Sequence, residues 1–225
     1  MIDFSPIWIS LKTAIVTIFI VFFLGILAAW WVVRRKNEVS KIFVDGILSL
    51  PLVLPPTVTG FFLLYIFGNN RAIGQFFSQE LGVQIAFSWV ATVLAAAVIS
   101  FPLMYRSARG AFEQVDMELL QAGRTLGMSE WSIFRKVLLP NALPGIVAGG
   151  VLAFARGLGE FGATAMIAGN IAGKTRTLPL AVYSSVVSGE MGEAAYYVAI
   201  VVVICLVMVV GLNWYLYLCK KRQEN

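Results

Sequence analysis

The chain has 225 residues, of which 59% are hydrophobic and 13% are charged, and its formal net charge is +5. A soluble domain of ordinary composition carries about 25% charged residues, and a soluble fold of this length cannot cover its surface with so few polar groups. Intrinsic disorder is also excluded, because it requires low hydrophobicity and high charge. The composition therefore predicts an integral membrane protein.

Histidine is absent, and the two cysteines, Cys205 and Cys219, lie in the last apolar run. If that run is helical, the two are roughly 21 Å apart along its axis, since each residue adds about 1.5 Å. An intrachain disulfide is therefore excluded, and no Cys/His metal site is available. The lack of His also removes the commonest general base. We expect no bound metal or cofactor and no enzymatic activity.

Five apolar runs are long enough to cross a bilayer, which takes about 20 mostly apolar residues. The first run is too long for a signal peptide, and no small-residue cleavage site follows it. The runs predict an all-α fold, a polytopic bundle of transmembrane helices that forms a single transmembrane domain over residues 1–225. The expected spans are about 10–33, 46–67, 83–105, 142–168 and 194–219.

The basic residues predict the orientation of the bundle. Segments 34–45, 106–140 and 220–222 hold twelve Lys and Arg, whereas the loops on the other side hold four. Because Lys and Arg concentrate in cytoplasmic loops, we expect the N-terminus outside and the C-terminus in the cytoplasm. The cations flank spans rather than forming a soluble basic face, so nucleic-acid binding is not expected. The localisation indicated is a membrane.

The internal segment 106–140 is charged and helix-forming, and two short helices can be placed in it. The first has an apolar face whose residues recur at helical spacing. Gly127 is expected to end it and Ser129 to cap the second helix. The face of the first helix comprises Val115, Leu119, Ala122 and Leu126.

Leu126, Met128 and Trp131 surround the bend between these two helices. One interpretation is a pair of surface helices that lie on the lipid headgroups. The other is a docking element that inserts into a groove of a cytosolic partner. Apolar residues at a bend favour docking, because the bend points away from the membrane.

The spacing of this segment is similar to the EAA loop of ABC importer permeases, which reads Glu-Ala-Ala, three residues, Gly, nine residues, Ile-x-Leu-Pro. Gln121, Gly123 and Val137 depart from that pattern, whereas Gly127 and the Leu-Pro pair are kept. The resemblance implies that the segment couples the chain to an ATPase. The residues it marks for coupling are Glu118, Gln121, Ala122, Gly123, Leu126, Gly127, Met128, Ser129, Trp131, Leu139 and Pro140.

Three further stretches, 50–60, 100–104 and 156–163, resemble the permease subunits of molybdate ABC transporters, whose near relatives carry tungstate or sulfate and thiosulfate. The resemblance implies a type I ABC importer permease fold and a homodimer that forms the translocation pathway. It also implies two cytosolic ATPase subunits, an extracytoplasmic oxyanion-binding protein and localisation in the cell membrane of a prokaryote. The chain lacks the Gly-x-x-x-x-Gly-Lys-Ser/Thr phosphate loop, so we expect ATP and Mg²⁺ to bind the partner.

The second run carries several prolines, which remove backbone donors and kink helices. Broken spans in transporters line cavities, so this run is a candidate for the pathway. The alternative is that its prolines merely start the span. A helix after Pro56 has only about 12 residues, or roughly 18 Å, and cannot span alone. The candidate pathway residues of this run are Pro55, Pro56, Thr57 and Thr59.

Arg156 and Glu160 are the clear charges within the expected spans, and they are four residues apart. On one helix they share a face, and charges in a membrane usually face a bundle interior or a wet cavity. One interpretation is an ion pair that braces the fourth span. The other is that Arg156 attracts the oxyanion or that the pair forms part of a gate.

Two alternatives from other classes are a secondary transporter and a membrane enzyme. A secondary transporter is expected to show internal repeats and titratable relay residues, and an enzyme a nucleophile or metal cluster. The sequence shows no clear repeat and no such cluster. These absences favour a transport subunit driven by a separate ATPase.

Overall fold

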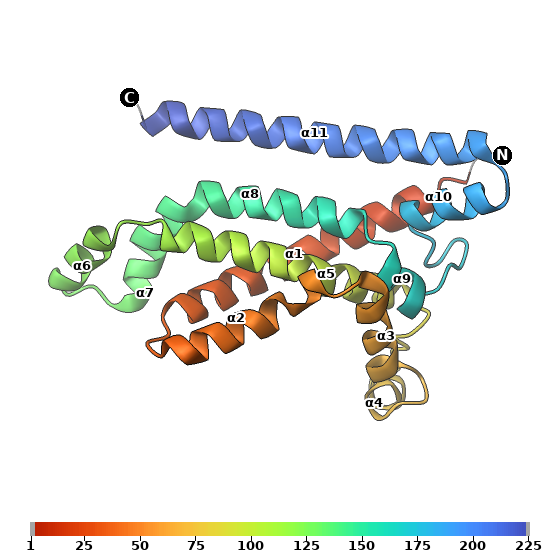
Figure 1. Ribbon diagram of the computed structural model, residues 1–225, viewed down its shortest axis with the longest axis horizontal. Helices are drawn as coiled ribbons and strands as arrows, with labels where there is room; N and C mark the ends of the chain where they lie inside the picture. The colour runs from red at the N-terminus through yellow and green to blue at the C-terminus, as the bar shows by residue number, and fades with distance from the viewer. Residues whose placement is uncertain (1–2, 224–225) are drawn as a thin grey trace.

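A computed structural model describes residues 3–223, apart from the side chains of residues 220, 222 and 223. Over these residues the chain is helical and contains no strand (Figure 1). The elements are α1 (Ser5–Val33), α2 (Glu38–Val53), α3 (Pro56–Phe67), α4 (Ala72–Glu80), α5 (Trp89–Glu113), α6 (Met117–Thr125), α7 (Glu130–Ile133), the π-helical turn η1 (Phe134–Leu138), α8 (Leu139–Leu158), α9 (Gly162–Ile167), α10 (Leu178–Val187) and α11 (Met191–Gln223).

Four continuous helices in the described chain are long and apolar enough to cross a membrane. A fifth crossing is reached when α2 and α3 count as one broken span. The two helices meet at an angle of 107°. Pro55 and Pro56 cause the break, because proline lacks an N–H and holds the preceding residue in extended conformation. Leu54 accordingly has φ −66° and ψ 141°.

The central layer consists of α1, α5 and α8, which pack side by side along the long axis (Figure 1). Their contact buries large side chains such as Met104, Tyr105 and Ile146. Glycine permits the close approach of α8 to α5: a Cβ on Gly149 would lie 2.3 Å from Ser107 Cβ.

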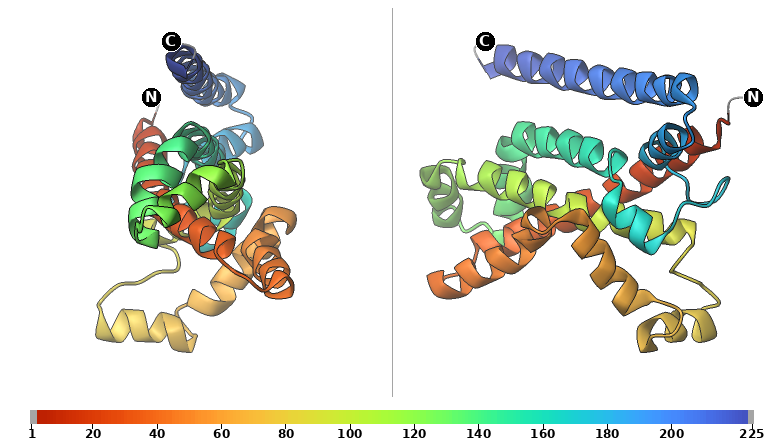
Figure 2. Two further views of the ribbon diagram at one scale, coloured as in Figure 1. Left: turned by 90° about the vertical axis from the view of Figure 1, so that its left-hand side faces the viewer. Right: turned by 45° about the vertical axis from the view of Figure 1, so that its right-hand side comes forward.

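The remaining helices surround this layer. Helix α2 packs on α5 near the end of the bundle where α6 and α7 lie, whereas α3 leaves the bundle and packs on α9 (Figures 1 and 2). Helix α11 lies on the outside, and only 6% of its most apolar window is buried. It therefore leaves a long apolar surface for lipid or a second chain.

Different connections and termini lie at the two ends of the bundle. The bend between α6 and α7, the connection from α1 to α2 and the C-terminus lie at one end, and the N-terminus lies at the other (Figure 1). An odd number of crossings requires this arrangement. The basic segments of the sequence thus gather at one end, here called the coupling end.

Three expected boundaries differ from the structure. Residues 106–113, expected in the cytoplasmic segment, continue α5. The expected span 142–168 is divided, because a helix runs without a break from Glu130 to Leu158 and α9 follows separately. The last span, expected to begin at residue 194, begins at Met191 as α11.

Candidate coupling surface and transport pathway

The bend between α6 and α7 is fixed by backbone hydrogen bonds around Gly127. Gly127 has φ +73°, a left-handed conformation that disfavours any residue with a Cβ. Its N–H donates to the Arg124 carbonyl at 3.0 Å, and the Met128 N–H donates to the Gly123 carbonyl at 3.1 Å. These are the two bonds of a Schellman motif. The first helix of the bend therefore ends at Gly127, as the sequence predicts.

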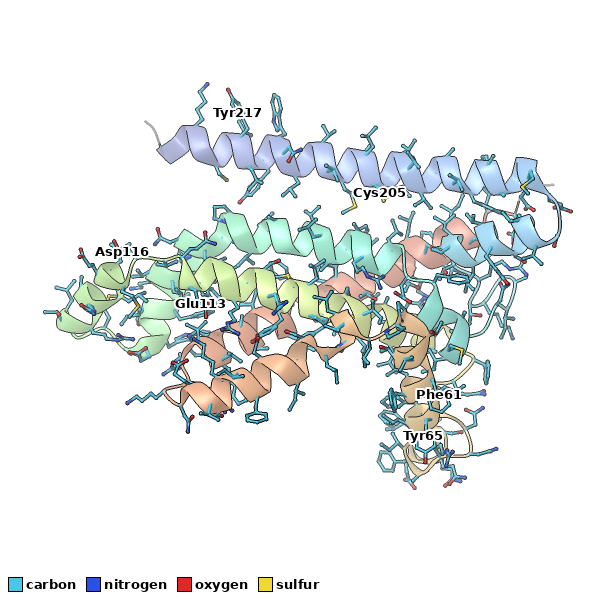
Figure 3. All side chains as sticks on the ribbon, in the orientation of Figure 1. Phe61, Tyr65, Glu113, Asp116, Cys205 and Tyr217 are labelled. Atoms are coloured by element: carbon cyan, nitrogen blue, oxygen red, sulfur yellow. The ribbon has the colours of Figure 1, made fainter. Side chains whose placement is uncertain are left out.

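Side chains cap both helices of the bend. Asp116 accepts from the Glu118 N–H at 2.9 Å and begins α6, directly after α5 ends at Glu113 (Figure 3). Ser129 accepts from the Ser132 N–H at 3.2 Å, which is the cap expected from the sequence. Across the bend, Arg124 Nε donates to Glu130 Oε1 at 2.9 Å. We call residues 116–133, with this geometry, the coupling unit.

Gly123 is the buried residue at the centre of the coupling unit. A Cβ at this position would lie 3.2 Å from Ile133 Cγ1, tighter than ordinary contact. Gly123 thus stands where the EAA pattern has its second alanine, and the branched side chain of Ile133 packs against it.

The apolar residues of the bend are not covered by the chain. Leu126 is 81% exposed, Trp131 is 54% exposed and Leu119 is 47% exposed. Val115 does not share their face, because it precedes the Asp116 cap and is buried in the core. Of the residues marked for coupling, Gly123 is buried, Met128 and Leu139 are half-buried, and the rest are exposed: Glu118, Gln121, Ala122, Leu126, Gly127, Ser129, Trp131 and Pro140.

Aromatic side chains join the coupling unit to the bundle. Trp131 stacks on Phe134 with ring centroids 5.3 Å apart, and Phe134 contacts Trp30 of α1 at 4.7 Å and Phe112 of α5 at 6.0 Å. The chain then continues as one helix through η1 into α8. Pro140 does not interrupt this helix. In the π-helical turn before it, the Leu139 N–H donates to the Phe134 carbonyl, five residues back. Helix α7 of the coupling unit is therefore continuous with α8, from Glu130 to Leu158.

The candidate pathway residues of the second run lie at the start of α3. Pro55 is the N-cap residue of α3 and Pro56 its first residue. Pro55 and Thr57 are exposed, Pro56 is half-buried and Thr59 is buried. The Thr59 hydroxyl has no hydrogen-bond partner among the described residues.

Arg156 and Glu160 form an ion pair, with Arg156 Nη1 2.7 Å from Glu160 Oε2. They do not share a helix as expected, because α8 ends at Leu158 and Glu160 lies in the connection to α9. The other oxygen of Glu160 accepts the Ala163 N–H at 2.8 Å. Glu160 is 2% exposed, whereas the Arg156 side chain is 33% exposed. Glu160 thus joins the end of α8 to the start of α9.

Helix α9, which follows Glu160, packs on α3. A Cβ on Gly162 would lie 3.0 Å from Pro56 Cβ, and one on Gly60 would lie 2.7 Å from Ala163 Cα. The helix that Glu160 caps therefore packs on the helix that begins at Pro56. The sequence analysis did not identify this contact, although the small residues at its centre are a signal for close helix packing.

Comparison with known proteins identifies the family. The model of the family described as binding-protein-dependent transport system inner membrane component matches residues 21–223. The chain belongs to this family. It is a multi-pass inner-membrane protein, and the alternative of a secondary transporter is wrong. The family name itself implies a separate substrate-binding protein.

Named relatives are similar to this chain over most of their length. The molybdenum transport system permease protein ModB of Haemophilus influenzae is 41% identical over 99% of this chain and 96% of its own. ModB of Escherichia coli is 46% identical over 85% of this chain and 84% of its own. The putative molybdenum transport system permease protein YvgM of Bacillus subtilis is 42% identical over 91% and 90%.

Solved structures share the fold. An inward-facing MetNI methionine ABC transporter chain superposes with a TM-score of 0.73 at 19% identity, covering 94% of this chain and 93% of that one. A chain of a bacterial ABC transporter for alginate import gives a TM-score of 0.77 at 14% identity, covering 95% and 78%. The fold is that of type I ABC importer permeases.

Proposed function

We propose that the chain is the membrane-spanning subunit of a molybdate importer, in which two copies form the pathway and separate ATPase subunits supply the energy. The similarity to relatives named for molybdenum, at 41% and 46% identity over most of both chains, supports molybdate as the substrate. It favours molybdate over tungstate, sulfate or thiosulfate. All are tetrahedral oxyanions that one pathway can pass, so selection falls to the external binding protein.

The observation that carries the proposal is the exposed apolar bend of the coupling unit. Leu126 is 81% exposed at a rigid turn, where a soluble partner can bury it. Burying a leucine side chain contributes about 1.5–3 kcal/mol. The ATPase is the proposed partner, and it also holds ATP and Mg²⁺, for which this chain needs no site of its own.

The continuity of the coupling unit with α8 provides the mechanism. A continuous helix spans Glu130 to Leu158, so displacement of its coupling end moves its other end as well. That end carries Arg156, and Glu160 joins it to α9 and thereby to α3. Closure of the two ATPases would then shift the break between α2 and α3 and switch the pathway between inward and outward states.

The two residues of the ion pair have different roles in this mechanism. Glu160 is a brace, because it is buried and both its oxygens accept hydrogen bonds. Arg156 is the candidate for attracting the oxyanion, because its side chain stays 33% exposed. Pro55, Pro56, Thr57 and Thr59 form the neighbouring wall in this proposal.

The second permease has an apolar surface available on α11. A cavity of about 650 Å³ separates the C-terminal part of α11 from α5 and α8, with Leu152 and Leu216 in its wall. We assign this face to packing with the second copy and with lipid. The extracytoplasmic oxyanion-binding protein would dock at the opposite end from the coupling unit.

The test is transport by a reconstituted complex. The chain is placed in liposomes with its ATPase, and the binding protein and labelled molybdate are supplied on the other side. The proposal predicts molybdate uptake that requires ATP and all three proteins. Uptake without ATPase, or equal uptake of sulfate in competition with molybdate through the same binding protein, would contradict it.

A further inference from the structure

A basic cleft lies at the coupling end, between the connection from α1 to α2 and the coupling unit. Its volume is about 750 Å³, within the range of about 300–1,000 Å³ for ligand pockets. Phe134 and Leu138 form part of its apolar wall. Its cationic side chains are Arg34, Arg35, Lys36, Lys41 and Arg124, against the carboxylates of Glu113 and Glu130.

The two carboxylates are already paired. Glu113 binds Lys41 at 3.4 Å and Arg109 at 2.9 Å, and Glu130 binds Arg124 at 2.9 Å. The cleft therefore keeps a surplus of positive charge from the connection between α1 and α2.

The surplus consists of Arg34, Arg35 and Lys36. None of them has a carboxylate oxygen within 4.0 Å in residues 3–223. The Arg35 guanidinium donates through Nη1 to Ser40 Oγ, but its Nε is buried without a hydrogen-bond partner. The three cations line the cleft, so an anionic oxygen bound there would offset their charge.

The cleft opens towards the lipid face of α1. A second cavity of about 460 Å³ shares Trp30, Arg34 and Arg35 with it and adds Leu27 and Trp31. Arg35 lies over the Trp31 ring at 3.8 Å, and Arg34 lies over the Trp30 ring at 4.8 Å. Tryptophan is enriched at the level of the headgroups. The cations and an apolar surface for acyl chains are thus adjacent.

We propose that the basic cleft binds the phosphate of an anionic phospholipid from the cytoplasmic leaflet, whose acyl chains lie along Leu27 and Trp31. Basic pockets between transmembrane helices on the cytoplasmic side bind such headgroups. The chemistry recognised is a phosphate oxyanion. The adjoining apolar cavity selects the lipid over a free anion, because only the lipid fills both. The proposal rests on the proposed function for the orientation of the bundle and for the movement of the coupling unit.

The consequence concerns the coupling unit. The cleft is lined both by the end of α1 and by the coupling unit, so a bound headgroup contacts two elements that move relative to one another during coupling. The lipid is therefore expected to steady the coupling unit against the bundle and to raise ATP-driven transport in membranes that contain it.

The experiment uses native mass spectrometry of the whole complex with its ATPase, after exchange into mixtures of phosphatidylglycerol and phosphatidylcholine. The wild-type complex is expected to retain phosphatidylglycerol and not phosphatidylcholine. The variant Arg34→Gln/Arg35→Gln is expected to bind phosphatidylglycerol about 30-fold more weakly, since each basic side chain near an anionic surface contributes a factor of about five. The charge-retaining Arg34→Lys/Arg35→Lys should bind within about threefold of wild type.

Matched controls distinguish a bound phospholipid from a free anion or a protein contact in the cleft. Lys174→Gln/Arg176→Gln removes the same charge from a loop outside the coupling end and should change nothing. Displacement of phosphatidylglycerol by millimolar inorganic phosphate or molybdate would overturn the lipid assignment in favour of a free anion. Loss of the ATPase from Arg34→Gln/Arg35→Gln would assign the cleft to a protein contact and overturn it too, as would unchanged lipid retention. Molybdate uptake by the wild type tests the proposed function separately.

Discussion

Replacement of Glu160 by alanine removes both interactions that join α8 to α9. Breaking a buried ion pair costs about 3–5 kcal/mol, and we take the lower end because one-third of the Arg156 side chain is exposed and can hydrate. Loss of the acceptor for the Ala163 N–H adds about 1 kcal/mol, as loss of a helix cap does. The expected total is about 4 kcal/mol. Glu160→Gln keeps a neutral acceptor and should lose about half as much.

The assay is the thermal midpoint of the detergent-solubilised protein, measured as the fraction that stays monodisperse after heating. For a chain of this length about 1 kcal/mol corresponds to a shift of about 2–4 °C, so Glu160→Ala should lower the midpoint by about 8–16 °C. Arg156→Ala leaves Glu160 buried without its partner and should lower it similarly. The double variant should be much less destabilised than the sum of the two, since the pair acts as a unit.

An unchanged midpoint for Glu160→Ala would refute the bracing role of Glu160. So would a double variant whose midpoint shift is the sum of the two single shifts. Exchange of the two residues is a poor test, although the i to i+4 spacing invites it. An arginine at position 160 cannot accept the Ala163 N–H, so the exchanged pair lacks the cap whatever its charge.

Three further variants test the packing. Gly127→Ala places a Cβ at φ +73° and should destabilise the coupling unit by about 1–2 kcal/mol, seen as faster proteolysis within 117–130. Gly123→Val should push Ile133 away at a cost of about 1–3 kcal/mol, and Ile133→Ala in the same chain should restore resistance to proteolysis; failure of that rescue would contradict the contact. Gly149→Val should lower the thermal midpoint of the bundle, because its Cβ would lie 2.3 Å from Ser107 Cβ, and Ser107→Gly should recover part of the loss.

Local signals in the sequence predicted the bend of the coupling unit. Gly127 ends one helix and Ser129 caps the next, because a left-handed glycine and a side-chain acceptor act within a few residues. The 12-residue length of α3 was also predictable, because Pro56 starts it and the apolar run ends at Phe67. In each of these places the decisive interaction lies within one turn of chain.

Contacts between distant segments were not predictable in the same way. The hydrophobic run continues past Leu158, and Arg156 and Glu160 have helical spacing, so a single span was expected. The helix ends instead because Glu160 turns to cap α9. The prolines in the sequence indicated the break after α2. The angle of 107° between α2 and α3 follows from the packing of Gly60 on Ala163, which no local pattern reveals.

The most direct test of the account is ATP-driven molybdate uptake by Leu126→Asp. Leu126 is 81% exposed, so the charge should leave the fold and membrane insertion intact while removing an apolar contact of at least about 1.5 kcal/mol with each ATPase. We predict that the ATPase no longer copurifies and that uptake falls at least about tenfold. The matched variant Leu81→Asp, at a 58% exposed leucine outside the coupling unit, should transport normally. Normal uptake by Leu126→Asp would contradict the central claim.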